Sequence, residues 1–321
     1  MSTDFLFVAG GLVLLFVGGE SLVRGSVALA ERLGLSKLMI GLTIVGFGTS
    51  APEMLVSVDA ALKDAPEIAL GNVVGSNIAN VLLIVGVAAV IVPIASWRRT
   101  AVRDALVAGV VALALYGLVQ GQAITRPEGM TLIAVLTVYL WASYWLEKRD
   151  RNNSVIEREV EEFEGLALKR AWAAPALAAG GIALLVIGAD LLVEGSVSIA
   201  RRFGVPDAVI GLSLVAVGTS LPELATAIVA AVRRHSDVVL GNVIGSNIFN
   251  VLAILGVTAV IHPIEVSARF REFDTLVMLA TACLLLMLLV LVSRIGRLWG
   301  VGMLVLYAAY MAFLFGNGMT A

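Results

Sequence analysis

Charged side chains are scarce in this sequence of 321 residues. Lys and Arg supply 22 side chains and Asp and Glu supply 24, so charged residues make up 14% of the chain, against about 25% in an ordinary soluble domain. Such a chain cannot cover a globule with polar surface, and a net charge of −2 offers no basic surface to nucleic acid. The composition therefore excludes a soluble enzyme, a disordered chain and a nucleic-acid-binding protein.

Cysteine and histidine are nearly absent as well. The single cysteine, Cys283, cannot form a disulfide within the chain, and the apolar run around it predicts a small core residue. His235 and His262 have no second metal ligand beside them, so we expect them in loops or at interfaces. No basic residue precedes the first apolar run, so no cleavable signal peptide is expected.

Long apolar runs, in contrast, fill the chain. Apolar residues make up 60% of it, and the mean hydropathy is +0.98. Ten windows are long enough to cross a bilayer: residues 5–29, 38–61, 68–94, 101–120, 129–146, 173–199, 208–231, 238–262, 274–293 and 298–316. We therefore expect an all-α polytopic membrane protein with ten transmembrane helices.

The basic residues between these windows predict an orientation. Six lie in loops on the side of the two termini and fifteen in loops on the opposite side, and loops rich in Lys and Arg face the cytoplasm. Both termini should therefore lie outside the cell. The charged segment 147–172 should form a cytoplasmic linker between two five-helix halves, residues 1–146 and 173–321.

The two halves share a sequence pattern. Residues 41–94 align with 211–264 without a gap, and 29 of the 54 pairs are identical. Because each unit holds five helices, the second is inverted relative to the first, which predicts inverted repeats with a site near the membrane midplane. Duplication that preserves packing alone would explain the repeated apolar residues but not acidic residues repeated in mid-span.

The first block of residues shared by the two halves, Gly-Thr-Ser-x-Pro-Glu, should break its helix. Pro52 lacks an N–H and clashes with the carbonyl of Gly48, so carbonyl groups near residues 46–49 should lose their partners. Hydroxyl and carboxylate oxygens surround the break in both halves: Thr49, Ser50 and Glu53, then Thr219, Ser220 and Glu223. Oxygen ligands of this kind suit calcium or another hard cation rather than zinc or copper.

The second block, Gly-Asn-Val-x-Gly-Ser-Asn-Ile-x-Asn, places a polar stripe on one helix face. The stripe recurs at intervals of four residues, as Asn72, Ser76 and Asn80 and again as Asn242, Ser246 and Asn250. We expect both stripes to point toward one symmetric centre, and Asn77 and Asn247, which lie off the stripe, to brace helices. A lone mid-span Ser or Thr usually serves packing, whereas a mid-span Glu is a functional candidate. Glu20 and Arg24, four residues apart, are expected to pair.

The duplicated blocks resemble the alpha repeats of the cation/calcium exchanger superfamily, specifically its prokaryotic sodium/calcium exchanger branch. The resemblance covers all ten predicted helices. It implies a transporter rather than an enzyme, which exchanges cytoplasmic Ca²⁺ for external Na⁺ by alternating access as helices 1 and 6 slide against the other eight. It implies no cofactor and no obligate protein partner, only inorganic cations as substrates and the lipid bilayer as surroundings.

By the same resemblance, Glu53 and Glu223 are the central Ca²⁺ ligands, with Asn80 and the carbonyls of Thr49 and Thr219 beside them. The implied flanking Na⁺ positions are Ser50, Ser76, Ser220, Ser246 and the carbonyls of Gly46 and Ala216. The chain departs from the family at Asn250, where exchangers often carry Asp. Two carboxylates balance one Ca²⁺ or two Na⁺, so exchange of three Na⁺ rests on the resemblance and not on this charge count.

Three other readings stay open at this stage. A proton- or K⁺-dependent calcium antiporter would use the same two glutamates, and buried carboxylates are able to carry protons. A passive cation channel is less consistent with broken helices in inverted repeats. An intramembrane hydrolase built on Ser50 or Ser220 is disfavoured, because no His or Lys base lies within the spans near either serine.

Overall fold

A computed structural model describes residues 2–33, 37–62, 66–95, 99–151, 172–202 and 216–318, and these residues are mostly helical. In the first half the helices, with π-helices labelled η, are α1 (Ser2–Leu33), α2 (Lys37–Ile40), η1 (Gly41–Val45), α3 (Gly46–Thr49), α4 (Ala51–Leu62), α5 (Pro66–Ala79), η2 (Asn80–Val85), α6 (Gly86–Ile91), α7 (Arg99–Leu118) and α8 (Arg126–Arg151). In the second half they are α9 (Ala173–Arg202), α11 (Ala216–Thr219), α12 (Leu221–Val232), α13 (Ser236–Phe249), η4 (Asn250–Leu255), α14 (Gly256–Ile261), η5 (Phe270–Asp274), α15 (Thr275–Leu291) and α16 (Arg297–Gly318).

Within the described ranges, eight helices are long and apolar enough to cross a membrane. A ninth span results if the bent pair Gly41–Thr49 and Ala51–Leu62 is taken as one. The predicted window 208–231 is represented by α11 and α12, and its residues 208–215 lie outside the described part of the chain. The helix α8 continues to Arg151, into the segment 147–172 that the sequence predicts as a linker, and residues 152–171 are not described.

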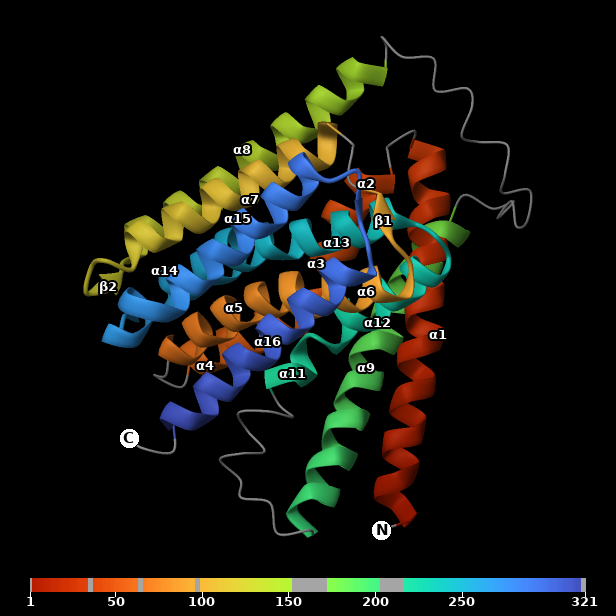
Figure 1. The fold of residues 1–321 in the computed structure, drawn as a ribbon, viewed down its shortest axis with the longest axis horizontal. Helices are drawn as coiled ribbons and strands as arrows, with labels where there is room; N and C mark the ends of the chain where they lie inside the picture. The colour runs from red at the N-terminus through yellow and green to blue at the C-terminus, as the bar shows by residue number, and fades with distance from the viewer. Residues whose placement is uncertain are drawn as a thin grey trace.

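Two long helices, α1 and α9, pack along each other and extend away from the remaining helices (Figure 1). Glycines recur every seven residues on both: Gly11, Gly18 and Gly25 on α1, and Gly181, Gly188 and Gly195 on α9. A Cβ added at Gly25 would lie 2.5 Å from the backbone nitrogen of Ala178, and one at Gly181 would lie 2.5 Å from that of Leu22. The two backbones are therefore in direct contact, as small residues allow between helices in lipid.

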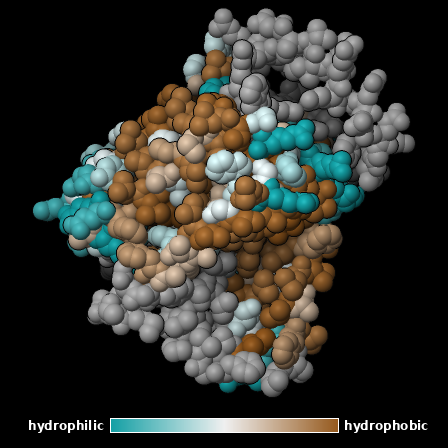
Figure 2. All heavy atoms as spheres, in the orientation of Figure 1, coloured by the Kyte–Doolittle hydropathy of each residue, from teal (hydrophilic) through white to brown (hydrophobic). Residues whose placement is uncertain are grey.

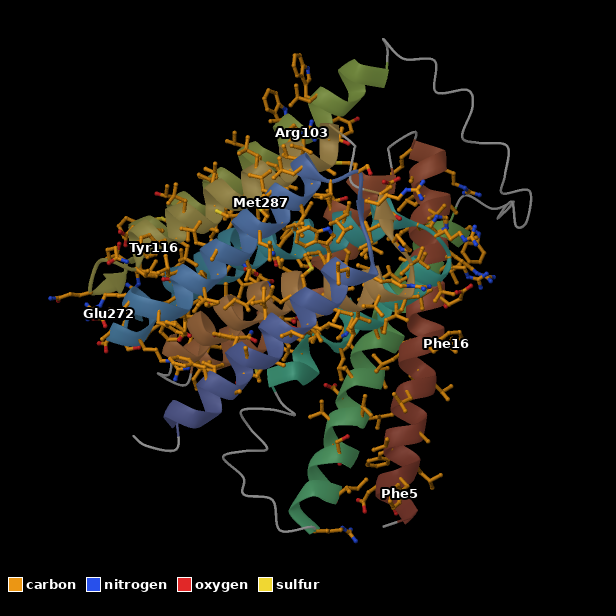
Figure 3. All side chains as sticks on the ribbon, viewed as in Figure 1. Phe5, Phe16, Arg103, Tyr116, Glu272 and Met287 are labelled. Atoms are coloured by element: carbon orange, nitrogen blue, oxygen red, sulfur yellow. The ribbon has the colours of Figure 1, made fainter. Side chains whose placement is uncertain are left out.

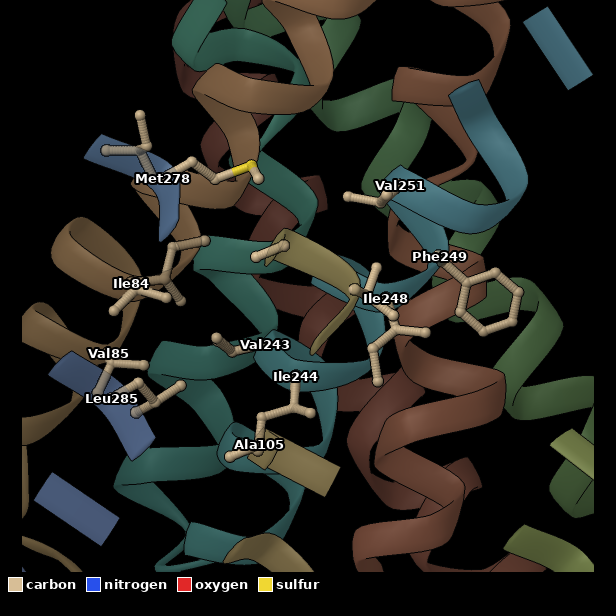
Figure 4. Packing of buried hydrophobic residues seen from close by; sticks show 14 of the residues in the cluster. Ile84, Val85, Ala105, Val243, Ile244, Ile248, Phe249, Val251, Met278 and Leu285 are labelled. Atoms are coloured by element: carbon tan, nitrogen blue, oxygen red, sulfur yellow. The ribbon is translucent and has the colours of Figure 1, made fainter. Parts of the chain in front are cut away.

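The core of the remaining bundle surrounds α13 and the helices that continue it. Of the most apolar window in Ser236–Ile261, 83% is buried inside the protein, against 11% for Arg297–Leu314 at the periphery. Val243, Ile244 and Ile248 of α13 belong to one apolar cluster with Ala105 of α7 and Leu285 of α15 (Figure 4). The central helix is thus enclosed by protein on all sides, and it carries the second polar stripe.

Apolar side chains also cover much of the outer surface. Figure 2 shows a broad hydrophobic band on this face, with hydrophilic residues gathered toward the left and right of the view. Phe5 and Phe16 of α1 and Met287 of α15 are exposed on it (Figure 3). An apolar exterior of this extent is expected where the solvent is lipid. Cys283 is exposed on α15 as well, so the predicted core position is wrong, because only 44% of the apolar window of that helix is buried.

Two short antiparallel strand pairs, which the all-α expectation did not include, join the two halves. The strand β1 (Ile94–Ala95) pairs with β4 (Arg294–Ile295), and β2 (Ala123–Ile124) pairs with β3 (Ile264–Glu265). Each pair takes one strand from residues 1–146 and one from residues 173–321. The loops after η2–α6 and η4–α14 are thereby attached to the opposite half, next to the helices that carry the polar stripes.

Candidate functional site

The predicted helix break is present in both halves of the chain. The axis bends by 49° between Gly41–Thr49 and Ala51–Leu62, with Pro52 in the first turn of α4. In the second half α11 ends at Thr219 and α12 begins at Leu221, with Pro222 in its first turn. Because proline has no N–H to donate, the carbonyl four residues before it cannot make its helical hydrogen bond.

The carbonyl of Gly46 has partners, although it was expected to lose them. It accepts hydrogen bonds from the Ser50 amide at 3.2 Å and from Oγ of Ser246, in the opposite half, at 3.2 Å. Oγ1 of Thr49 donates to the Val45 carbonyl at 3.0 Å. The break is therefore capped by hydroxyl groups, one of them supplied by α13, whose Gly245 lies so close to η1 that a Cβ would overlap the Leu42 backbone.

The two glutamates, each 1% exposed, are linked across the halves by serine hydroxyls. Oγ of Ser50 donates to Oε1 of Glu223 at 3.2 Å, and Oγ of Ser220 donates to Oε1 of Glu53 at 3.2 Å. The second carboxylate oxygen of each glutamate, Oε2, is buried and has no hydrogen-bond partner among the residues that the structure describes. The serine that follows the Gly-Thr pair in one half thus holds the acid of the other half and leaves one oxygen of that acid free.

Asn80 and Asn250, each 1% exposed, show the same pattern. Their Nδ2 groups donate to opposite halves: Asn80 to Oδ1 of Asn247 at 2.9 Å, and Asn250 to Oδ1 of Asn77 at 3.0 Å. Oδ1 of each is buried, and no described residue donates a hydrogen bond to it. Both are the first residues of π-helices, η2 and η4, which the sequence analysis did not predict. A π-helical turn within an α-helix often marks a functional site.

Two other members of the predicted stripes donate hydrogen bonds to backbone carbonyls of their own half. Nδ2 of Asn72 donates to the Glu53 carbonyl at 3.2 Å, and Nδ2 of Asn242 donates to the Glu223 carbonyl at 3.5 Å. Each therefore attaches a proline-broken helix to the stripe helix of its own half. A polar stripe specifies a helix face but not the partner that each side chain finds.

The remaining candidates lie around these groups. Oγ of Ser220 also reaches Oγ of Ser76 at 3.4 Å, and Oγ1 of Thr49 donates to Oδ1 of Asn242 at 3.1 Å. Thr219, the last residue of α11, is half-buried, and Ala216 is the first residue of that helix. An apolar cavity of about 210 Å³ lies beside the site between α4 and η4, and among the described residues that line it Ser50 alone is polar. The cavity itself therefore supplies no set of ion ligands.

The site therefore contains four buried oxygens that have no hydrogen-bond partner among the described residues. Each half supplies one carboxylate oxygen and one amide oxygen. Among the described residues neither glutamate forms an ion pair with a basic side chain. Burying carboxylates without a countercharge is costly. Carboxylate and amide oxygens without a nitrogen or sulfur ligand form a set suited to a hard cation such as Ca²⁺ or Na⁺.

The ion pair predicted for Glu20 and Arg24 is present but lies apart from this site. Glu20 of α1 also pairs with Arg233 at the end of α12, with Nε of Arg233 at 3.1 Å from Oε2 of Glu20. It connects α1 with the bundle at the protein surface.

Comparison with known proteins gives concordant matches along the chain. The family model described as sodium/calcium exchanger protein matches residues 3–145 and 173–316. The proposed antiporter CaxA of Alkalimonas amylolytica is 39% identical over 97% of this chain and 98% of its own length. The sodium/calcium exchanger MaX1 of Methanosarcina acetivorans is 34% identical over 98% of this chain and 99% of its own.

Solved structures agree with the sequence matches. The sodium-calcium exchanger NCX_Mj, soaked with zero Na⁺ and Ca²⁺, superposes with a TM-score of 0.84 at 30% identity, over 97% of this chain and 99% of that one. The same exchanger soaked with 10 mM Na⁺ and 10 mM Sr²⁺ gives a TM-score of 0.82 at 31% identity, over 97% and 98% of the two chains. The described helices therefore have the architecture of a membrane exchanger.

Proposed function

Since the chain belongs to the sodium/calcium exchanger protein family, we propose that it is a secondary antiporter that exports Ca²⁺ in exchange for Na⁺. The observation that carries the proposal is the set of four unpartnered buried oxygens: Oε2 of Glu53 and Glu223, and Oδ1 of Asn80 and Asn250. The carbonyls of Thr49 and Thr219 would complete the shell of a Ca²⁺ ion at this centre. Family membership supports a transporter and not an enzyme in this proposal.

The charge of the site accounts for exchange. The carboxylates of Glu53 and Glu223 neutralise one Ca²⁺ or two Na⁺, so the two ions compete for the same oxygens and only differential binding moves the protein between states. For Na⁺, the flanking ligands in this proposal are the hydroxyls of Ser50, Ser76, Ser220 and Ser246 and the carbonyls of Gly46 and Ala216. A third Na⁺ would leave the site with one net positive charge, and its movement would be worth about 2.3 kcal/mol per 100 mV.

The membrane arrangement in this proposal has ten spans in two inverted five-helix repeats, residues 1–146 and 173–321, related about an axis in the membrane plane. The linker 147–172 is cytoplasmic and both termini are outside. Access alternates when the α1–α9 pair slides relative to the bundle. The close glycine contacts between these helices support their movement as one body.

A transport assay tests the coupling ion. The purified full chain is reconstituted in vesicles that impose an outward gradient of Na⁺, K⁺ or H⁺, and uptake of radioactive Ca²⁺ is followed. We expect uptake with the Na⁺ gradient alone and loss of uptake when that gradient is dissipated. Uptake driven by H⁺ or K⁺ instead would favour one of these as the coupling ion. These alternatives are tested because the neutral Asn250 stands where exchangers of the resembled family often carry Asp. Uptake that persists without any counter-ion gradient would identify a channel.

A further inference from the structure

The four asparagines between the stripe helices form a crossed arrangement. Asn250 donates to Oδ1 of Asn77, and Asn80 donates to Oδ1 of Asn247. Each bond joins residues of opposite halves, and all four side chains are buried. The two acceptors are the asparagines that lie off the polar stripe.

From this geometry we infer that Asn77 and Asn247 are positioning residues, which turn the amides of Asn250 and Asn80 so that their carbonyl oxygens face the transported cation. The inference rests on the proposed cation site. It adds a role for two residues that donate no ligand themselves, and it specifies a pairing: Asn77 acts through Asn250, and Asn247 acts through Asn80.

The physical reason lies in the asymmetry of a side-chain amide. One end accepts hydrogen bonds and binds cations, while the other carries two N–H groups and repels them. Rotation of the amide by half a turn exchanges the two ends with little change in shape. An acceptor placed at the nitrogen end therefore decides which end faces the centre, and Oδ1 of Asn77 and of Asn247 occupies that position.

The acceptor at Asn77 is itself held in place. Its Nδ2 donates to the backbone carbonyl of Asn247 at 3.2 Å and approaches Sδ of Met278 at 3.7 Å. Because its nitrogen is engaged on the opposite helix, Oδ1 of Asn77 must point toward Asn250. Asn80 and Asn250 are also the first residues of η2 and η4, so their backbone positions are set by the same helices that carry their partners.

Direct binding measurements test the role of Asn77. Titration of CaCl₂ into the purified full chain in Na⁺-free detergent solution gives a Kd without requiring transport. Asn77→Ala removes the acceptor, and we expect Ca²⁺ binding to weaken roughly 10- to 100-fold, the usual effect of removing a group that orients a metal ligand. The matched control is Thr258→Ala, which removes a buried, unpartnered hydroxyl and installs the residue found at the equivalent Ala88. This control should leave the Kd within twofold.

A double-mutant cycle separates positioning from general damage to packing. In an Asn250→Ala background the Asn77→Ala change should have no further effect on the Kd, since the group it orients is gone. In an Asn80→Ala background it should retain its full effect. If Asn77 served only packing, its substitution would change the Kd by the same factor in both backgrounds, and that result would overturn the inference.

The outcomes also separate this inference from the proposed function. Absence of Ca²⁺ binding by the unaltered chain would contradict the proposed function. Binding by the unaltered chain together with a Kd within twofold for Asn77→Ala would contradict the positioning role alone. If Asn77→Ala does not yield a monodisperse protein, Asn247→Ala is measured in its place. Its effect on the Kd should then disappear in an Asn80→Ala background and persist in an Asn250→Ala background. Equal effects in both backgrounds would overturn the inference.

Discussion

Ser50 and Glu223 lie in opposite halves of the chain, 173 positions apart, yet the hydroxyl of Ser50 donates to a carboxylate oxygen of Glu223 at 3.2 Å. The reciprocal bond from Ser220 to Glu53 has the same length. Each half therefore supplies the donor that orients the acid of the other half. Neither repeat can form this arrangement alone.

The glutamates should be required for cation-dependent stability as well as for transport. Glu53→Gln or Glu223→Gln removes one negative charge from the proposed site and replaces an unpartnered carboxylate oxygen. A ligand that binds only the folded state stabilises it by an amount that rises with the logarithm of the ligand concentration divided by Kd. We therefore expect Ca²⁺ to raise the Tm of the unaltered protein in detergent and not that of either variant, as measured by scanning fluorimetry.

The matched control for the glutamates is Glu20→Gln, which alters an acid of α1 outside the site. The Ca²⁺-dependent rise in Tm should persist in this variant. An equal rise in Tm for Glu53→Gln, Glu223→Gln and the unaltered protein would place the bound Ca²⁺ elsewhere.

The serines that bridge the halves should affect Na⁺ binding. Ser220→Ala removes the donor to Glu53 and a hydroxyl oxygen that we assign to a Na⁺ position. One net hydrogen bond is worth about 0.5–1.5 kcal/mol, so the half-saturating Na⁺ concentration for Ca²⁺ exchange should rise roughly 2- to 12-fold. Ser50→Ala should behave in the same way through Glu223. Transport kinetics in vesicles at varied Na⁺ measure the change.

Ser26→Ala provides the comparison for the two serines. The hydroxyl of Ser26 on α1 is fully buried and has no partner in the described part of the chain, so its removal should leave the Na⁺ dependence unaltered. The assignment of Ser50 and Ser220 is wrong if their variants match Ser26→Ala.

The glycine contacts between α1 and α9 predict a position-specific effect on stability. Gly181→Ala would place a Cβ 2.5 Å from the Leu22 nitrogen, and such overpacking typically costs about 1–3 kcal/mol. The neighbouring Gly180 has no atom within 4 Å of an added Cβ. Gly180→Ala should therefore be neutral or stabilising by up to about 1 kcal/mol, because alanine favours the helix. Thermal unfolding of both variants in detergent checks the difference, and equal Tm values would contradict the close contact.

Several features could be predicted from sequence because they depend on local chemistry. Apolar windows predict the helices, and Pro52 predicts the bend of 49° within the second window. The duplicated motifs indicate the glutamates and the family. The exposure of Cys283 was not predictable, because an apolar helix face toward lipid has the same composition as one toward protein. The π-helices at Asn80 and Asn250 also have no distinct sequence pattern.

The hydrogen-bond partners of the polar side chains could not be predicted from the sequence. The motif spacing places Asn72 and Asn80 on one face of a helix, yet Asn72 donates to the Glu53 carbonyl while Asn80 donates across the halves to Asn247. Helical periodicity specifies direction around an axis and not what lies opposite. The neighbours depend on how two helices cross, which residues distant in sequence decide together.

By itself, the sequence determined that the chain is a membrane protein built from a duplicated unit, because hydropathy and repetition are properties of residue order. It also determined which acids and amides stand in the repeated motifs. Only the tertiary structure decided that the serines donate hydrogen bonds to the glutamates of the opposite half. It also decided that Asn77 and Asn247 accept hydrogen bonds from the side-chain amides of Asn250 and Asn80. Hydrogen bonds require atoms within about 3 Å, and packing alone brings residues some 170 positions apart to that distance.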